Sequence, residues 1–465
     1  MLCVTGSPVR LGPAFSDGAS RCRYQLGRKA AMRHVRVLRS KHMRLRADSE
    51  EKPDQASSEP DKPRVPGPGP PQTSQDPSRN LKLPPEDLAI IKDRVFGLDN
   101  FYVRSLTNTE AGATFMGNVR GRDPSVAYQK ARQRLQDAFG DKYTLVLSRM
   151  DEVNTAIILP TYAVVDNNLS STNEVVVAGL CAAATLVTVL GANGVPTESF
   201  VQLFRGDFSN TNQFAAALPG SVAFLSALGA HEAAHRFVAK QTGDQVSLPL
   251  LFPSPLGTLG SFGGITRIKS PAANRGALCK LAAWGPLAGA AVSMAFVLTG
   301  IALTMAGQGS TEVQTSAFKD SFLVGGLGQL LLGSELAAKD SIQVHPVLVA
   351  GWSALIVNCL NAVPIGELDG GRVAFAIWGP RNAQRITAAL FILLGICSTF
   401  DALSLWWGAF TFILARAQAQ PPREGISEPT NAERAVGLAA LALPLLVLLP
   451  YPIPLKAIIP EIPDF

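Results

Sequence analysis

The feature that most limits how this chain can fold is a series of long stretches without Asp, Glu, Lys or Arg. A helix needs about 20 consecutive apolar residues to cross a bilayer. The stretches that reach or approach this length are Val175–Thr197, Phe208–Ala230, Leu281–Thr311, Ser341–Gly366 and Ala435–Leu455. Ile386–Phe400 and Ala402–Ala415 are shorter, and Ser321–Ser334 reads as interfacial or re-entrant. The sequence predicts a multi-span α-helical membrane protein with about six to eight spans. Buried helices of one large soluble protein are the alternative, but so many uncharged stretches rarely occur together in a soluble chain.

The chain before these stretches has a different character. Residues 1–47 contain eleven Lys or Arg against the single Asp17 and lack a continuous apolar core. This composition predicts an organelle transit peptide, with a disordered basic tail as the alternative. The whole chain has a net charge of +6. Residues 1–47 alone carry a larger positive charge, so the remaining residues have a net negative charge. The basic balance is therefore no argument for nucleic-acid binding. Residues 48–83 are rich in Asp, Glu, Ser and Pro and are expected to be a disordered linker.

Residues 84–170 are expected to form a small soluble α+β domain. Asp123-Pro124 predicts the start of a helix that Gly140 ends, and 144–147 and 156–159 are typical of short strands. Gly117–Gly121 is interpreted as a plain loop. Residues 171–465 form the predicted membrane-embedded domain.

One segment of the membrane-embedded domain does not fit a helix. Leu248–Lys269 contains three prolines and four glycines among apolar residues. Non-helical backbone at membrane depth is tolerated only where protein or a water-filled cavity covers it. We therefore expect a re-entrant, β-like loop, whose free edge could pair with an extended peptide.

Histidine is scarce, and two of the five histidines form the motif HEAAH at 231–235. The motif follows the uncharged stretch Phe208–Ala230. If that stretch is a helix, His231 and His235 lie on one face, where two imidazoles can bind one Zn²⁺ while Glu232 takes a proton from the metal's water. The alternative is a pair of polar groups hydrogen-bonded inside a bundle. The six cysteines form no CxxC pair, so the sequence does not indicate a Cys-type zinc site.

A second segment supplies a candidate third ligand, because catalytic zinc usually has three protein ligands plus water. The sequence NAVPIGELDGGR at 361–372 closes the stretch Ser341–Gly366 and carries Asp369 before two glycines. An ionisable residue at membrane depth is a functional-site candidate by default. His345 is the rival ligand. It lies at the opposite end of the stretch and precedes Pro346, so we expect a structural role for it.

Residues around this second segment have more modest expected roles. Asn361 and Pro364 are expected to shape the unwound approach to Asp369, with Asn361 a candidate for hydrogen bonding to substrate backbone. A simple helix-end turn is the alternative. Gly370 and Gly371 are expected to permit close backbone approach. Gly285-Pro286 with Gly289 is interpreted as a small-residue helix-packing face without a chemical role.

The two motifs together resemble the site-2 protease family of intramembrane zinc metalloproteases. HEAAH lies on one membrane segment, and N-x-x-P followed by LDGG lies on a later one. The chain is more closely similar to the plastid branch of that family, the ethylene-dependent gravitropism-deficient and yellow-green proteases. This resemblance covers most of the chain from about residue 85. It includes GNVRG at 117–121, LGSFGGITRIKS at 259–270, GPLAGAA at 285–291 and HPVLVAGW at 345–352.

The resemblance implies a site and a function. His231, His235 and Asp369 would bind Zn²⁺, and Glu232 would be the general base. The protein would cleave membrane proteins in or near their transmembrane segments, in the thylakoid or inner envelope membrane of a plastid, after import by a plastid transit peptide. A catalytically silent scaffold or chaperone on the same fold is the second hypothesis. A metal-ion transporter is the third, and it is disfavoured because the uncharged stretches otherwise contain almost no acids or histidines.

Overall fold

The computed structural model describes residues 81–110, 112–150, 153–164, 172–414 and 421–451. The predicted transit peptide (1–47) and most of the predicted linker (48–80) lie outside the described residues.

The N-terminal α/β region contains a four-stranded antiparallel sheet with the order β1-β2-β4-β3. Its elements are α1 (Pro85–Ile90), the π-helical turn η1 (Ile91–Val95), β1 (Phe101–Thr109), β2 (Gly112–Val119), α2 (Pro124–Phe139), β3 (Tyr143–Met150), β4 (Val153–Pro160) and α3 (Thr161–Val164). The predicted bounds of α2 are confirmed. Asp123 accepts a hydrogen bond from the backbone N–H of Ser125 at 2.8 Å, and Gly140 ends the helix with a φ of 59°. The predicted strand 144–147 lies within β3, and the predicted strand 156–159 lies within β4.

The expectation of a loop at Gly117–Gly121 is wrong for its first half, because Gly117 to Val119 complete β2. Gly117 pairs with Val103 of β1. A Cβ on Gly117 would lie 2.0 Å from the carbonyl oxygen of Tyr102. The glycine therefore allows close strand pairing at this point.

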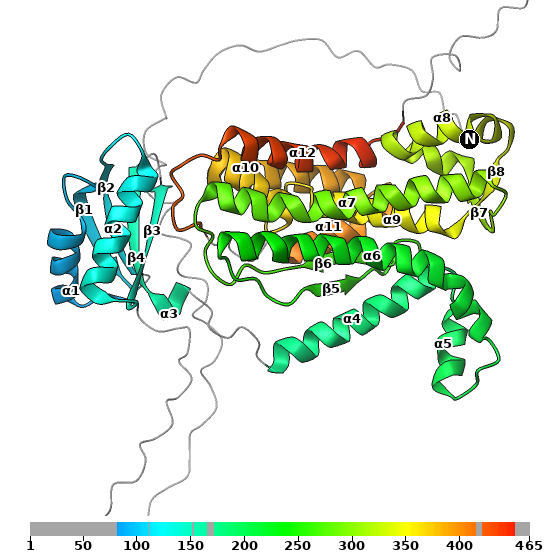
Figure 1. The fold of residues 1–465 in the computed structure, drawn as a ribbon, viewed down its shortest axis with the longest axis horizontal. Coiled ribbons are helices and arrows are strands. Elements are labelled where there is room, and N and C mark those ends of the chain that lie inside the picture. Colours follow the sequence, from blue (N-terminus) through cyan, green and yellow to red (C-terminus); the bar gives the residue numbers. More distant parts are fainter. Residues whose placement is uncertain (1–80, 111, 151–152, 165–171, 415–420, 452–465) are drawn as a thin grey trace, which may run out of the picture. The chain divides into compact units, whose positions relative to one another are not determined.

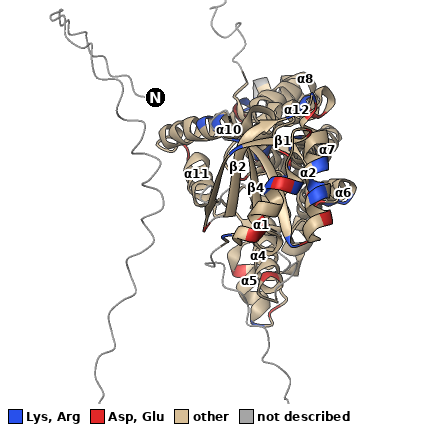
Figure 2. Cartoon of the chain, turned by 90° about the vertical axis from the view of Figure 1, so that its left-hand side faces the viewer, with Lys and Arg blue, Asp and Glu red and all other residues tan. Residues whose placement is uncertain are grey.

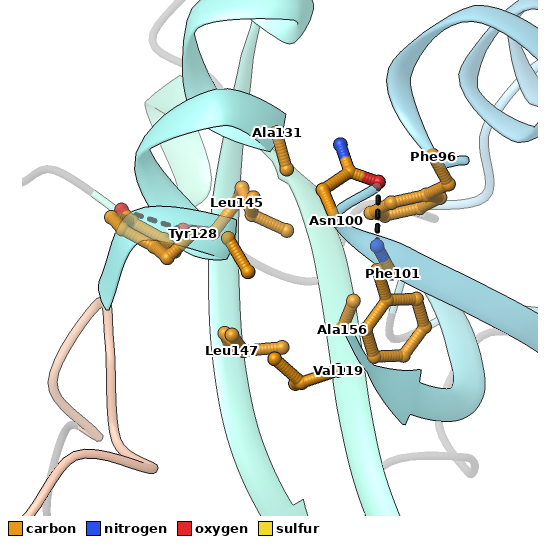
Figure 3. A pocket seen from close by; sticks show the side chains of 10 residues that line it. Phe96, Asn100, Phe101, Val119, Tyr128, Ala131, Leu145, Leu147 and Ala156 are labelled. Atoms are coloured by element: carbon orange, nitrogen blue, oxygen red, sulfur yellow. Dashed lines mark hydrogen bonds between the residues drawn. The ribbon is translucent and has the colours of Figure 1, made fainter. Parts of the chain in front are cut away.

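The core of this region encloses a small cavity (Figure 3). The side chain of Asn100 lies beside it, accepting from the backbone N–H of Phe101 at 2.5 Å and donating to the carbonyl of Val95 at 2.8 Å. Apolar side chains such as Phe96 and Leu145 form most of the remaining wall. The cavity volume is about 10 Å³, enough for one water molecule at most. It is a packing void and not a ligand pocket.

The remaining described residues are mainly helical. The helices are α4 (Thr172–Ala192), α5 (Thr197–Phe204), α6 (Thr211–Thr242), α7 (Arg275–Met305), η2 (Thr315–Asp320), α8 (Phe322–Ala338), α9 (Pro346–Asn361), α10 (Asp369–Cys397), α11 (Ala402–Leu414) and α12 (Asn431–Leu448). The strands form two antiparallel pairs, β5 (Leu250–Pro253) with β6 (Ser261–Ile265) and β7 (Thr311–Gln314) with β8 (Ser341–Val344).

Four of the described helices, α4, α6, α7 and α12, are long and apolar enough to cross a membrane. They expose large apolar side chains, such as Leu180 of α4, which is 66% exposed. Shorter apolar helices include α9, α11 and the first part of α8, and α11 carries no charged residue (Figure 2). The prediction of a membrane protein built from α-helices is thus supported, whereas the count of six to eight spans stays a prediction.

Two segments are divided in ways that charge alone does not reveal. Ser341–Gly366 is not one long helix, because β8 occupies its start and α9 begins only at Pro346. Proline favours the first helical turn, where its missing N–H costs nothing. Helix α10 contains a break at Gly379, with φ 79° and ψ 171°, followed by Pro380.

Helix α7 is the centre of the helical part of the chain. It packs against α6, α9, α10 and α12 (Figure 1). Glycines make this close packing possible. A Cβ on Gly300 of α7 would lie 2.3 Å from the backbone nitrogen of Leu348 in α9.

The predicted β-like segment contains the β5–β6 hairpin, in which Leu250 pairs with Ile265 and Phe252 with Gly263. Helix α4 packs along β5, whereas β6 contacts α6 and α9. Residues Ser261 to Gly264 of β6 are buried. The hairpin therefore brings a buried strand next to the helix that carries HEAAH.

Candidate metal centre

Three of the predicted site residues meet in one buried cluster. His231 and His235 lie on one face of α6, with their Nε2 atoms 3.0 Å apart. Asp369 is the first residue of α10, and its Oδ2 lies 3.2 Å from Nε2 of each histidine. The relative exposures of the two histidines are only 1% and 3%, and that of Asp369 is 7%. Among the described residues, these three form the only group of His, Cys, Asp and Glu side chains arranged to hold a metal ion.

Two glycines explain how Asp369 reaches this position. A Cβ on Gly370 would lie 2.0 Å from the carbonyl oxygen of Ala362, and a Cβ on Gly371 would lie 2.1 Å from that of Gly366. The start of α10 therefore packs directly on the turn that follows α9. The expected role of the two glycines in close backbone approach is confirmed.

Hydrogen bonds determine which nitrogen of each histidine carries the proton. Nδ1 of His235 lies 2.8 Å from the backbone carbonyl of Leu281, which can only accept. Nδ1 of His231 lies 2.8 Å from Oδ1 of Asn358. The Asn358 amide nitrogen donates to the carbonyl of Ala354 at 2.8 Å, which fixes the amide orientation. Both Nδ1 atoms are therefore donors, and both Nε2 lone pairs face the cluster.

This donor set fits zinc. Two nitrogen lone pairs and a carboxylate oxygen point toward one another, and no proton lies between the two nitrogens. These electron-rich atoms repel one another unless a cation lies among them. Ligands about 2.1 Å from one tetrahedral zinc lie about 3.4 Å apart. The observed separations of 3.0 to 3.2 Å are close to that spacing. Imidazole and carboxylate are also ligands that catalytic zinc sites use.

Glu232 lies beside the cluster with its two oxygens in different environments. Its Oε2 accepts a hydrogen bond from the hydroxyl of Thr266 at 2.5 Å. Its Oε1 is buried and has no hydrogen-bond partner among the described residues. A Cβ on Gly264 of β6 would lie 2.3 Å from Oε1. One oxygen is thus anchored, and the other is available as a proton acceptor.

Among the other predicted residues, Asn361 and Pro364 lie at the end of α9 that is nearer to this cluster, and His345 lies at the opposite end. Asn361, the last residue of α9, donates to the carbonyl of Val357 at 3.1 Å and lies against Gly263 of β6. Pro364 lies in the turn between α9 and α10. His345 caps the other end of α9, accepting from the backbone N–H of Val347. The 16 residues of α9 span about 24 Å at about 1.5 Å per residue, so the structure does not bring His345 to the cluster.

Sequence reasoning missed several residues that contact this site. They are Thr266, Asn358, Ser293, Arg372 and the backbone carbonyl of Leu281. The interpretation of Gly285 and Gly289 as a packing face without a chemical role is incomplete. A Cβ on Gly285 would lie 2.2 Å from Nε2 of His235, and one on Gly289 would lie 1.9 Å from Oδ1 of Asn358. Positions 281, 285, 289 and 293 lie four residues apart and therefore share one face of α7. This spacing is the sequence pattern that could have indicated a supporting role for that face.

Arg372 joins the two halves of the site. Its NH1 donates to the backbone carbonyl of Thr266 at 3.1 Å and lies 3.6 Å from Oδ1 of Asp369. Its Nε lies 3.8 Å from Glu367. The segment that anchors Glu232 is thereby tied to the helix that carries Asp369.

Comparisons with known proteins agree with this geometry. Residues 219–399 match Peptidase family M50, and residues 89–169 match the EGY3 middle domain. The rice (Oryza sativa subsp. indica) protein named probable zinc metalloprotease EGY2, chloroplastic, is 36% identical over 83% of this chain and 70% of its own length. The Arabidopsis thaliana protein of that name is 36% identical over 80% of this chain, which spans 66% of that relative. Arabidopsis EGY1, also named a probable chloroplastic zinc metalloprotease, is 27% identical over 79% of this chain and 72% of its own length.

No solved structure matches the chain. The M50 match contains both HEAAH and LDGG, the two segments that meet in the metal cluster. The chain therefore belongs to peptidase family M50, the site-2 proteases, among the chloroplastic EGY zinc metalloproteases.

Proposed function

We propose that this chain is an intramembrane zinc endopeptidase of a plastid membrane, thylakoid or inner envelope, that cleaves membrane proteins in or near their transmembrane segments. The observation that carries the proposal is the buried cluster of His231, His235 and Asp369 beside Glu232. The helix that carries both histidines, α6, is long and apolar enough to span a membrane. The chloroplastic names of the relatives support the location.

The depth of the cluster supports cleavage within the membrane. His235 precedes the end of α6 at Thr242 by seven residues, or about 10 Å at about 1.5 Å per residue. Leu281, whose carbonyl supports His235, lies six residues after the start of α7. A peptide bond that reaches the cluster must enter the helical region and not merely touch its end.

In the proposed mechanism, His231, His235 and Asp369 hold the metal. Zinc at this site would supply Lewis acidity, which would lower the pKa of the attacking water and favour polarisation of the scissile carbonyl. Glu232 accepts the proton of the attacking water at Oε1 and later delivers it to the leaving amine. Thr266 holds Oε2, so Glu232 needs no rearrangement between these two proton transfers.

The β5–β6 hairpin is the proposed place where substrate is held. We infer that it is the re-entrant element and that an unwound substrate pairs with its main chain, because backbone pairing recognises any extended peptide. Gly264 and Thr266 contact Glu232, and Gly263 contacts Asn361, so a strand along β6 would pass close to the base. Asn361 would then hydrogen-bond to substrate backbone, and Pro364 would keep the approach to Asp369 unwound.

The proposed organisation of the chain follows the changes in composition. Residues 1–47 are the plastid transit peptide, and residues 48–83 are the linker. Residues 84–170 are the soluble domain, and residues 171–465 are the membrane-embedded protease domain. The match of residues 89–169 to the EGY3 middle domain supports the bounds proposed for the soluble domain.

The test compares the purified wild-type chain with Glu232→Gln, which keeps the shape of the side chain but cannot accept the proton. Zinc content is measured by mass spectrometry, and cleavage is measured on a transmembrane reporter peptide in bicelles. Zinc in both proteins with cleavage reduced at least about 100-fold in the variant supports the proposal. Zinc in both with cleavage in neither favours the scaffold alternative. Absence of zinc from both contradicts the metal centre itself.

A further inference from the structure

We propose that Asn358, held in place by α7, is a positioning residue that orients His231 for metal binding. This inference rests on the proposed zinc site and deepens it. The motif HEAAH provides the imidazole, but nothing within the motif sets its rotation. The structure assigns that task to a side chain 127 residues away in sequence.

The polarity of the hydrogen bonds around Asn358 is fully determined. Ser293 donates its hydroxyl proton to the carbonyl of Gly289 at 2.7 Å, so its oxygen is an acceptor for the Asn358 amide nitrogen at 3.4 Å. The same amide nitrogen donates to Ala354. Oδ1 is therefore the atom that faces Nδ1 of His231 at 2.8 Å. Only the tautomer with a proton on Nδ1 satisfies this arrangement, and that tautomer presents Nε2 to the metal.

The space that Asn358 occupies exists because α7 lacks a side chain at Gly289. A Cβ there would lie 1.9 Å from Oδ1 of Asn358 and 2.6 Å from its Cγ. The side chain of Asn358 is 2% exposed, so it has no alternative position in solvent. Substitution of Gly289 would therefore displace the amide from His231 without changing either residue of that hydrogen bond.

The two histidines are supported differently. His235 is oriented by the backbone carbonyl of Leu281, which no substitution of a side chain removes. His231 depends on a side chain, so its support can be deleted. This difference makes Asn358 the position at which outer support of the metal can be tested directly.

The experiment measures zinc affinity of the full chain in detergent by competition with a chelator, without substrate. Asn358→Leu preserves the side-chain size and removes the acceptor, and Gly289→Ala displaces the amide from a different helix. We expect each to weaken zinc binding by about 10- to 100-fold, as for other residues that orient metal-ligating histidines. Ser293→Ala leaves the Ala354 contact intact and is expected to have a smaller effect. Cys359→Ala is the matched control, since Cys359 is also buried on α9 but belongs to an apolar cluster that contains no residue of the metal site.

Thermal unfolding of the metal-free proteins shows whether each variant folds. Zinc affinity within about twofold of wild type in a folded Asn358→Leu or Gly289→Ala protein would overturn the proposal, as would an equal loss in Cys359→Ala. Should Asn358→Leu not fold, Gly289→Ala still decides the question. A wild-type chain that binds zinc but cleaves nothing would contradict the proposed function and leave this comparison unaffected.

Discussion

The hydroxyl of Thr266 donates to Oε2 of Glu232 at 2.5 Å, across 34 residues of sequence. The hairpin segment and the catalytic helix are thus joined through the proposed base itself. The other carboxylate oxygen lies buried beside Gly264 with no partner among the described residues. If Glu232 is the base, as proposed, this contact makes the residues around β6 part of the catalytic machinery.

Replacing Thr266 with Val should slow catalysis without removing zinc. A hydrogen bond to a charged group contributes about 1.5–3 kcal/mol, so kcat should fall by about 10- to 100-fold while KM changes little. Steady-state cleavage of a transmembrane reporter peptide measures both. Thr266→Ser keeps the hydroxyl and should recover most of the rate. Equal loss in the Ser and Val variants would indicate a packing role only.

Gly264→Ala should displace the base. The added Cβ would lie 2.3 Å from Oε1 of Glu232, so the carboxylate would have to turn away from the position in which it accepts a proton. We expect kcat to fall at least about 100-fold, the lower range for loss of a general base, with zinc content unchanged. Gly257→Ala is the control, because a Cβ there meets nothing within 4 Å. A Gly264→Ala protein with wild-type kcat would contradict the assigned position of the base.

Gly285→Ala should remove the metal. The new Cβ would lie 2.2 Å from Nε2 of His235, the atom that faces the cluster. Zinc content per chain should therefore fall well below that of wild type. Gly229→Ala in α6 offers a comparison, since its Cβ meets nothing within 4 Å. Full zinc occupancy in folded Gly285→Ala would mean that His235 binds the metal from another orientation.

Asp369→Ala and His345→Ala should separate the third ligand from its rival. We expect Asp369→Ala to lose zinc, because its Oδ2 lies 3.2 Å from both histidine nitrogens. We expect His345→Ala to retain zinc and to lose about 1 kcal/mol of stability, a typical cost of removing a helix N-cap. Zinc analysis and thermal unfolding of both proteins provide the measurements. The reverse pattern would make His345 the ligand.

Local signals made much of this site predictable. HEAAH at helical spacing placed two imidazoles on one face of α6, and LDGG marked the close approach of α10 to α9. Asp123 and Gly140 bounded α2 because caps act through backbone groups within a few residues. The Gly and Pro content of Leu248–Lys269 excluded a helix and favoured the hairpin.

The missed features depend on contacts between distant segments. Asn358 reads as an ordinary polar residue in an apolar helix until α6 and α7 pack against it. Thr266 acquires its role only when β6 lies beside Glu232. Stretches free of charge also do not reveal where a helix begins. Pro346 divides one stretch into β8 and α9, and Gly379 breaks α10.

The backbone support of His235 has a consequence for deciding which relatives of this chain are active enzymes. A supporting backbone carbonyl cannot be recognised in an amino-acid sequence, because every residue has one. The glycine at 285, which leaves room for the His235 ring, can be recognised. Gly289 and Asn358, which support His231, can be recognised in the same way. A relative that retains HEAAH and LDGG but carries larger residues at 285 or 289 would have the ligands without the space to use them. Such a protein would be misclassified as a protease by its motifs alone.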